Sequence, residues 1–438
     1  NKDDNNIDMK YCTAQQAAEL VKSGDGVYFQ GSTAVPTIIQ EALANRWREL
    51  TDVKIYSAFC ITKEEAPFCN PQYKESFITR SLFLCSDQRR WVKEGYGNMI
   101  PAFLGEIPFL FRSGQIKIDV ACINCSLPDT DGYCSYGISA DLAVSAVESA
   151  KIVIAQINKS VPYLYGGARI HISKIDAAVE CDIPPIALEF GEPTEVESAI
   201  GKYIATEIED GATLQIGVGG IPNAVLGAIK HHKHLGLHTE AMTDGVVRLM
   251  EEGVIDNSLK KVHPGVSVGS LALGSKKMYN FLDYNKKTEF YDVAYTNDPQ
   301  IIRENPKVVA INSALEIDLT GQICADSIGE SIFSSVGGQH DFMYGGALSE
   351  GGKTFIAMPS VTNKGIGKIV PTLTPGAGVV TTRFQTQYVV TEHGIVYLRN
   401  LDLAQRAKAL ISIANPADRE ELEKAACKRF GYSFLRLK

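Results

Sequence analysis

The chain has 438 residues, of which 45% are hydrophobic and 21% charged, and its formal net charge at pH 7 is -8. This length predicts two or three domains, and the composition is typical of a globular protein whose core needs no disulfides. The negative charge, with no basic run interleaved with aromatic residues, argues against a nucleic-acid partner and against binding to anionic lipid.

Targeting and cysteine patterns point to a cytoplasmic protein. No apolar run reaches the roughly 18 residues that a membrane helix needs. Residues 1–8 are polar and acidic, so we expect an unstructured lead-in there and no secretory signal. The 10 cysteines are scattered, mostly in apolar stretches, where a free thiol behaves as a small buried hydrophobe. A reducing compartment is the expected location.

Two segments repeat one pattern of strand, glycine loop and helix. Val27–Gln30 is extended and leads into the loop Gly31–Pro36, and Thr213–Ile216 leads in the same way into Gly217–Pro222. After each loop, apolar residues recur at the spacing of an amphipathic helix, at 35, 38, 39, 42 and 43 in the first copy and at 221, 224, 225, 228 and 229 in the second. Each predicted helix has proline near its start, where the missing N–H costs nothing.

Two further echoes follow in the same order. Ile123–Leu127 resembles Ile311–Leu315, and residues 150–155 resemble residues 352–357. Alternating strands and helices predict mostly parallel sheets covered on both faces. We therefore predict the α/β class, with two similar open α/β domains produced by internal duplication. The predicted domains span residues 9–190 and 195–438, divided at the proline-rich stretch Pro184–Pro193.

A single glutamate stands out in the second copy. Leu235–Thr239 is predicted to be a short buried strand, and Thr243 and Asp244 are typical of a helix start, so Glu240 falls at the carboxyl end of the strand. In the matching strand of the first copy, Val53–Ala58, this position is held by alanine. Ligands of such folds bind at the carboxyl ends of strands, so one active centre per chain is the functional interpretation. An ordinary loop glutamate would fit the same pattern.

The stretch from Leu235 to Met250 resembles the active-site segment of the acetyl-CoA hydrolase/transferase family, and most closely its branch of 4-hydroxybutyrate and butyryl CoA-transferases. Further matching stretches run in family order over most of the chain, namely 295–299, 312–322, 336–342, 351–360, 389–394 and 406–416. The resemblance implies a pair of CoA-transferase-like α/β domains, with the nucleophile Glu240 in the second. It also implies acyl-CoA and short-chain carboxylates as substrates, acetate among them, and no permanently bound cofactor or metal.

A carboxylate suits this chemistry because it can attack a thioester carbonyl and form a covalent intermediate. A glutamate with an ordinary pKa, near ~4.3, is already ionised at neutral pH. No histidine base is needed, so His238 is predicted to be a packing or orienting residue.

The tetrahedral oxyanion that forms in each step needs fixed hydrogen-bond donors. The glycine-rich stretches Gly217-Val218-Gly219-Gly220 and Gly337-Gly338 could expose backbone N–H groups, although tight turns would explain them equally. By resemblance, the donors are the Asn297 amide and a backbone N–H of Gly337 or Gly338, and we select Gly338 as the catalytic one. His340 and Asp341 are expected to shape the turn. The residues predicted to contact substrate or CoA are Gly217, Val218, Gly219, Gly220, Gly337, Gln339, Lys364, Lys368 and Gly31.

Three weaker signals are interpreted as structural. Cys122 and Cys125 form a CxxC pair inside an apolar strand, and the histidine-rich turn 231–234 lacks the spacing of a closed metal site. Gly217-Val218-Gly219 lacks the third glycine and the following acidic residue of a dinucleotide loop, so NAD is not expected.

Two other functions remain open at this point. An acyl-CoA hydrolase would use the same glutamate and let water cleave the intermediate, and a metabolite sensor would bind without turnover. A homodimer or larger homo-oligomer is the expected assembly.

Overall fold

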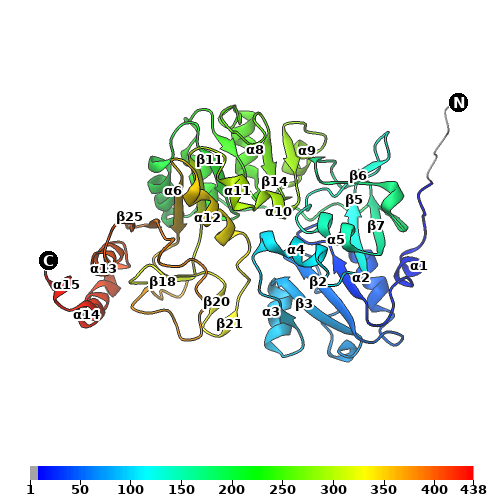
Figure 1. Ribbon diagram of the computed structural model, residues 1–438, viewed down its shortest axis with the longest axis horizontal. Coiled ribbons are helices and arrows are strands. Elements are labelled where there is room, and N and C mark those ends of the chain that lie inside the picture. The colour runs from blue at the N-terminus through cyan, green and yellow to red at the C-terminus, as the bar shows by residue number, and fades with distance from the viewer. Residues whose placement is uncertain (1–7, 438) are drawn as a thin grey trace. The chain divides into compact units, whose positions relative to one another are not determined.

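The computed structural model describes residues 8–437, so residues 1–7, which hold most of the predicted lead-in, lie outside the described residues (Figure 1). The chain forms two compact units. The first comprises residues 8–188 together with Val268–Thr296, and the second comprises Glu189–Ser267 and the described residues from Asn297 onward. The predicted boundary stretch contains the first division. Residues 268–296, which the predicted ranges 9–190 and 195–438 assign to the second domain, pack instead in the first unit, where β16 (Thr288–Phe290) pairs with β8 (Tyr165–Gly166).

The first unit is built on a seven-stranded sheet in which every neighbouring pair is parallel. Its strand order is β10-β7-β5-β1-β2-β3-β4. The strands are β1 (Gly26–Phe29), β2 (Val53–Ala58), β3 (Phe77–Phe83), β4 (Asn98–Met99), β5 (Val120–Cys125), β7 (Ile152–Asn158) and β10 (Ala177–Cys181).

Short helices and strands complete this unit. The helices are α1 (Ala14–Ala18), α2 (Thr37–Ala44), α3 (Ser86–Lys93), α4 (Ile107–Arg112), α5 (Ala143–Ser149), α9 (Lys276–Leu282) and α10 (Val293–Thr296). The remaining strands are β6 (Tyr133–Ser135), β9 (Arg169–His171), β14 (Ser267–Gly269) and β15 (Leu271–Ala272).

The second unit has a six-stranded sheet of order β12-β11-β17-β22-β24-β25, parallel except for its last pair. The strands are β11 (Thr213–Ile216), β12 (Gly236–Leu237), β17 (Val308–Asn312), β22 (Lys353–Ala357), β24 (Tyr388–Thr391) and β25 (Gly394–Tyr397). The helices are α6 (Glu195–Glu207), α7 (Gly220–Ala228), α8 (Asp244–Glu251), α11 (Pro299–Ile302), α12 (Gln339–Leu348), α13 (Leu403–Ser412), α14 (Arg419–Phe430) and α15 (Tyr432–Leu435). Short strands complete this unit, namely β13 (Ala241–Met242), β18 (Glu316–Asp318), β19 (Ile323–Cys324), β20 (Ser327–Ile328), β21 (Ser331–Ile332) and β23 (Ile369–Val370).

The two sheets share one topology. The order β10-β7-β5-β1-β2 in the first unit recurs as β24-β22-β17-β11-β12 in the second, with every pair parallel. The sequence echoes fall on equivalent strands, because 123–127 and 311–315 cover the ends of β5 and β17. The predicted fold class, two similar open α/β domains with mostly parallel sheets, is therefore confirmed.

Each predicted strand–loop–helix unit forms at the expected place. The extended run before the second loop coincides with β11; α2 follows its glycine loop, whereas α7 begins at Gly220, inside the stretch predicted as loop. Helix α2 begins after Pro36 without a side-chain cap of its own. Its free N–H groups are satisfied from β7 instead, where Gln156 Oε1 accepts hydrogen bonds from Ile38 N (3.0 Å) and Ile39 N (3.3 Å). This capping ties the helix to the carboxyl end of the sheet.

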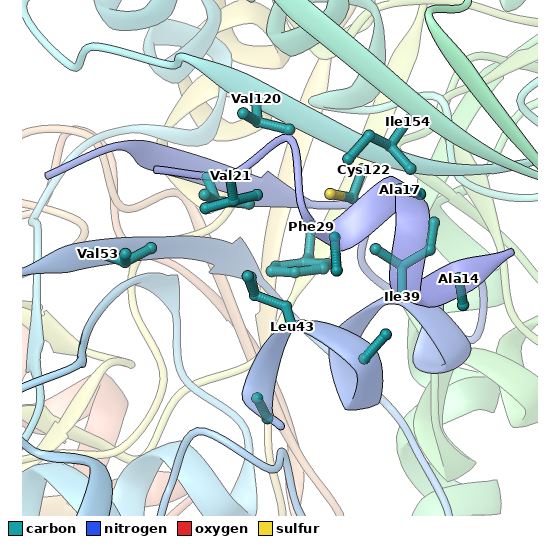
Figure 2. Packing of buried hydrophobic residues seen from close by; sticks show 14 of the residues in the cluster. Ala14, Ala17, Val21, Phe29, Ile39, Leu43, Val53, Val120, Cys122 and Ile154 are labelled. Carbon is teal, nitrogen blue, oxygen red and sulfur yellow. The ribbon is translucent and has the colours of Figure 1, made fainter. Parts of the chain in front are cut away.

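The core of the first unit gathers around Phe29 of β1. Figure 2 shows this ring among Ile39 and Leu43 from α2, Val21 and Cys122, all of which belong to one buried cluster. Phe29 is fully buried and its ring lies 5.4 Å from that of Phe68. Strand β1 is thus held in place by apolar packing, and its carboxyl-terminal loop is held with it.

Among residues 8–437, no helix is both long and apolar enough to cross a membrane.

We predict that Phe29→Ala lowers the free energy of unfolding by about 3–5 kcal/mol, because it removes a buried ring and leaves a cavity. Urea denaturation followed by circular dichroism measures this change. Phe384→Ala is the matched control, since the Phe384 side chain is 83% exposed, and its effect should stay within about 0.5 kcal/mol. Equal effects of the two substitutions would contradict the placement of Phe29 in the core.

Candidate active site

Glu240 follows the end of β12, in a turn that is fastened to the neighbouring strand. The regular pairing of β12 with β11 stops at Leu237. Two residues later, the Thr239 hydroxyl accepts a hydrogen bond from Ile216 N (3.2 Å) and donates one to Ile216 O (3.0 Å). The Thr239 side chain thus replaces the next backbone hydrogen bonds between β12 and β11. The chain can turn out of the sheet here because this side chain still holds it to β11. Glu240 therefore lies half-buried at the carboxyl edge of the sheet.

Asn297 lies between the short helices α10 and α11 and is 1% exposed. The next residue, Asp298, caps α11 by accepting a hydrogen bond from Gln300 N at 2.9 Å. This cap fixes the turn that carries Asn297. The amide Nδ2 of Asn297 donates a hydrogen bond to Glu240 Oε2 at 2.7 Å.

Gly338 is the N-cap residue of α12 and faces the same two side chains. A Cβ atom added to it would lie 2.1 Å from Glu240 Oε2 and 2.6 Å from Asn297 Nδ2. A side chain at this position would therefore have to displace the Glu240 carboxylate or the Asn297 amide. The preceding Gly337 has φ +56, which lets the loop bend into the helix.

Three chain segments that are far apart in the sequence thus meet at one carboxylate oxygen. Residues 240, 297 and 338, which the sequence predicts to be catalytic, lie within contact distance of one another. All three belong to the second unit.

The start of α12 makes this position favourable for negative charge. The N-terminus of a helix carries a partial positive charge and unpaired N–H groups. Gln339 N donates to Val336 O (3.3 Å), whereas the Gly338 N–H has no hydrogen-bond acceptor among the described residues. A backbone donor is therefore free beside Glu240. The Gln339 side chain, predicted to contact substrate, donates to Ser313 O at 3.2 Å and anchors the helix to the end of β17.

A cavity of about 360 Å³ opens next to the loop after β11. It is lined by the predicted stretch Gly217–Gly220, by Ile311–Ser313 at the end of β17, and by Glu197, Ile221, Pro222, Ala357 and Pro359. Gly217 has open space around its Cα, so packing does not require a glycine there. Gly220 is different, because the Glu197 carboxylate occupies the space that a side chain would fill. The cavity shares no lining residue with the Glu240 group, although both lie at the carboxyl edge of the sheet.

For three other predicted binding residues, the described contacts do not include Glu240, Asn297 or Gly338. Gly31 lies in the first unit, where a Cβ atom would come within 2.0 Å of the Ala58 carbonyl oxygen, so close backbone packing accounts for the glycine. Lys364 is exposed. Lys368 is half-buried, and burial lowers the pKa of its ammonium group while Glu392 opposes this shift. None of the described hydrogen bonds of the two lysines reaches the Glu240 group or the cavity.

His238, Cys122 and Cys125, which were interpreted as structural, are all buried. His238 is 2% exposed and its ring faces that of Phe342 at 6.3 Å. Cys122 and Cys125 are buried in β5, and burial raises the pKa of both thiols. Within residues 8–437, no group of three His, Cys, Asp or Glu side chains is arranged to hold a metal ion.

Two features of the site were not found from the sequence. The first is Thr239, whose hydroxyl holds the Glu240 turn. The second is Asp341, which was expected only to shape the glycine turn. Its carboxylate is 4% exposed, and its Oδ2 lies 3.4 Å from Asn297 Nδ2. An aspartate in the first turn of a helix is common for electrostatic reasons, so the sequence carried no signal of this contact. In the same region, α8 begins at Asp244 as predicted, but the Thr243 hydroxyl does not cap it.

Comparison with known proteins identifies the family. The model of the acetyl-CoA hydrolase/transferase N-terminal domain matches residues 2–188, and that of the C-terminal domain matches residues 274–426. The chain belongs to the acetyl-CoA hydrolase/transferase family. The resemblance seen in the sequence is thus confirmed.

Individual relatives cover nearly the whole chain. A succinyl-CoA:acetate/propanoyl-CoA:succinate CoA transferase of Fasciola hepatica is 44% identical over 94% of this chain and 86% of its own length. A 4-hydroxybutyrate coenzyme A transferase of Clostridium kluyveri is 41% identical over 96% and 98%. The crystal structure of a 4-hydroxybutyrate CoA-transferase from Porphyromonas gingivalis superposes with a TM-score of 0.83 at 36% identity, covering 96% of this chain and 98% of that one. These relatives confirm the expected enzyme class, a CoA-transferase.

We predict that Gly338→Ala lowers kcat by on the order of 10² or more, because the added methyl group displaces the Glu240 carboxylate from its position against Asn297. Steady-state kinetics with acyl-CoA and acetate measure the loss. The matched control is Gly227→Ala, since no atom lies within 4 Å of the added Cβ in α7. A Gly338→Ala enzyme as active as Gly227→Ala would contradict the geometry described above.

Proposed function

We propose that this enzyme moves coenzyme A between short-chain carboxylates by a ping-pong mechanism, with Glu240 as the covalent carrier. One observation carries the proposal. Glu240 Oε2 lies 2.7 Å from Asn297 Nδ2 and directly against Gly338 at the start of α12, so a carboxylate, an amide donor and the N-cap residue of a helix meet at one point. A nucleophile and an oxyanion site in such proximity suit acyl transfer.

The reaction would begin with attack of Glu240 on the thioester carbonyl of an acyl-CoA. The carbon–sulfur bond breaks, CoA leaves as its thiolate, and the acyl group stays on Glu240 as a mixed anhydride. The thiolate then attacks the glutamyl carbonyl, and the first acid leaves with one oxygen of Glu240. The glutamyl-CoA thioester keeps the energy of the original bond. A second carboxylate reverses both steps, so no ATP and no permanently bound cofactor are needed.

Asn297 Nδ2 and the Gly338 N–H would stabilise the tetrahedral oxyanion in each step. Donors that are fixed before the reaction need no reorganisation when charge develops, and this is the source of their effect. Two features support fixed donors here. The Asp298 cap holds the Asn297 turn, and the Gln339 side chain ties the start of α12 to β17.

The proposed acids are 4-hydroxybutyrate or butyrate, with acetate as the partner. The names of the relatives support this class, and the Fasciola hepatica enzyme adds succinate and propanoate to the acids worth testing. The loop Gly217–Gly220 and its cavity would contact substrate or CoA, as would Gly337 in the turn before α12. Gly31, Lys364 and Lys368 remain predicted to contact substrate or CoA. A cytoplasmic location and a homo-oligomeric assembly also remain predictions.

The kinetic pattern tests the mechanism. If Glu240 carries CoA between two acids, the first product must leave before the second substrate reacts, and initial-rate plots should give parallel lines. The enzyme should also exchange labelled acetate into acetyl-CoA with no second acid present. Intersecting lines without exchange would indicate direct transfer in a ternary complex. Release of free CoA from acyl-CoA alone, at the rate of the transfer reaction, would indicate a hydrolase, and binding without turnover would indicate a sensor.

We predict that Asn297→Ala lowers kcat by about 10²–10³ and changes KM much less, because its donor acts mainly in the transition state. Asn305→Ala is the matched control. Asn305 is equally buried in the second unit, but its Oδ1 accepts from Lys261 N and Val262 N ahead of β17, at the amino end of that strand. The control should lose stability and keep its kcat. An effect of Asn297→Ala on KM alone would show that Asn297 only positions substrate.

A further inference from the structure

Asn297 is held between two carboxylates. Its Nδ2 donates to Glu240 Oε2 at 2.7 Å and lies 3.4 Å from Asp341 Oδ2. Asn297 and Asp341 are 1% and 4% exposed, so water contributes little to their orientation. The Asn297 Oδ1 atom is buried and accepts no hydrogen bond among the described residues. The donor end of this amide therefore faces both acids, and the acceptor end faces neither.

An asparagine amide has nearly the same shape after a half-turn about its last bond, but donor and acceptor change places. In the reversed orientation, Oδ1 would face two carboxylate oxygens and, during the reaction, the oxyanion. Such a contact repels instead of stabilising. The orientation of Asn297 is thus as important to the proposed chemistry as its position.

Glu240 cannot fix this orientation throughout the cycle. Once it is acylated or joined to CoA, it is no longer a free carboxylate, and its hydrogen bond from Asn297 is lost or weakened. At those stages the Asn297 amide must serve the oxyanion. A second, unreactive acceptor is needed to keep Nδ2 turned toward the reacting carbon.

We propose that Asp341 is a positioning residue that keeps the amide of Asn297 turned with its donor toward Glu240 while Glu240 is covalently occupied. One N–H of Nδ2 is directed to Asp341 and the other remains for the oxyanion. The longer separation from Asp341 fits a resting state in which the free Glu240 carboxylate competes for the same amide. Asp341 takes its place in the first turn of α12, which also carries Gly338, so one helix start places both the backbone donor and the acceptor that orients the amide. This inference rests on the proposed function.

A double-mutant cycle tests the role of Asp341. Asp341→Ala should lower kcat at least about tenfold, but by less than the 10²–10³ expected for Asn297→Ala, and should leave KM within about threefold. Because Asp341 acts through Asn297, the double variant Asn297→Ala/Asp341→Ala should be no slower than Asn297→Ala alone. Asp341→Asn keeps an acceptor oxygen but adds a donor that tolerates the reversed amide, so its kcat should fall between those of the wild type and Asp341→Ala. If Asp341→Ala does not fold, the same cycle is run with Asp341→Asn, whose shape is unchanged.

Asp318→Asn is the matched control for the loss of a buried aspartate. Asp318 is 2% exposed in the second unit and holds its own turn through Thr320 and Gln322. This substitution should lower the melting temperature, keep kcat, and show no coupling to Asn297→Ala. Losses that multiply in the Asn297/Asp341 double variant, or an unchanged kcat in Asp341→Ala, would overturn the proposal. Failure of this proposal and failure of the proposed function can be told apart by mass spectrometry. If only the role of Asp341 is wrong, Glu240 still carries a CoA adduct in the wild type and in Asp341→Ala. If the proposed function is wrong, Glu240 carries no adduct even in the wild type.

Discussion

The hydrogen bond from Asn297 Nδ2 to Glu240 Oε2 joins the turn after β12 to the turn between α10 and α11. The surrounding contacts keep the donor and the acceptor of this bond in place. Thr239 fastens the Glu240 turn to β11, and the Asp298 cap fixes the Asn297 turn. Gly338 completes the group because it has no side chain to separate α12 from the carboxylate. The proposed mechanism would depend on this contact, since the oxyanion formed after attack by Glu240 needs a nearby hydrogen-bond donor.

The two halves of the chain share one scaffold, but Glu240, Asn297 and Gly338 all belong to the second unit. Both sheets repeat the same five-strand order, so both present loops at the carboxyl edges of equivalent strands. In the first unit, β2 ends at Ala58, and the glycine of the preceding loop serves close backbone packing against that residue. In the second unit, the strand equivalent to β2 leads into Glu240. The same scaffold is therefore used for backbone packing in one copy and positions the carboxylate of Glu240, the proposed nucleophile, in the other.

Much of this architecture could be predicted from the sequence because local patterns determine it. The apolar spacing after Pro36 and after Gly219 predicted α2 and α7, and the run at 213–216 predicted β11. The packing of residues 268–296 in the first unit was not predicted, since the pairing of β16 with β8 is not local. The contact of Asp341 with Asn297 was missed for the same reason. An acidic residue in a first helical turn is already explained by its favourable interaction with the helix N-terminus. Only the tertiary structure brings Asp341 to an amide 44 residues away.

The central claim is that Glu240 becomes covalently attached to CoA. The most direct measurement is mass spectrometry of the enzyme mixed with acyl-CoA in the absence of an acceptor acid, followed by proteolysis and peptide mapping. A CoA adduct, joined with loss of water, is expected on the peptide that contains Glu240, and it should disappear when acetate is added or when Glu240 is replaced by alanine. An adduct on another residue, or full transferase activity in Glu240→Ala, would contradict this claim.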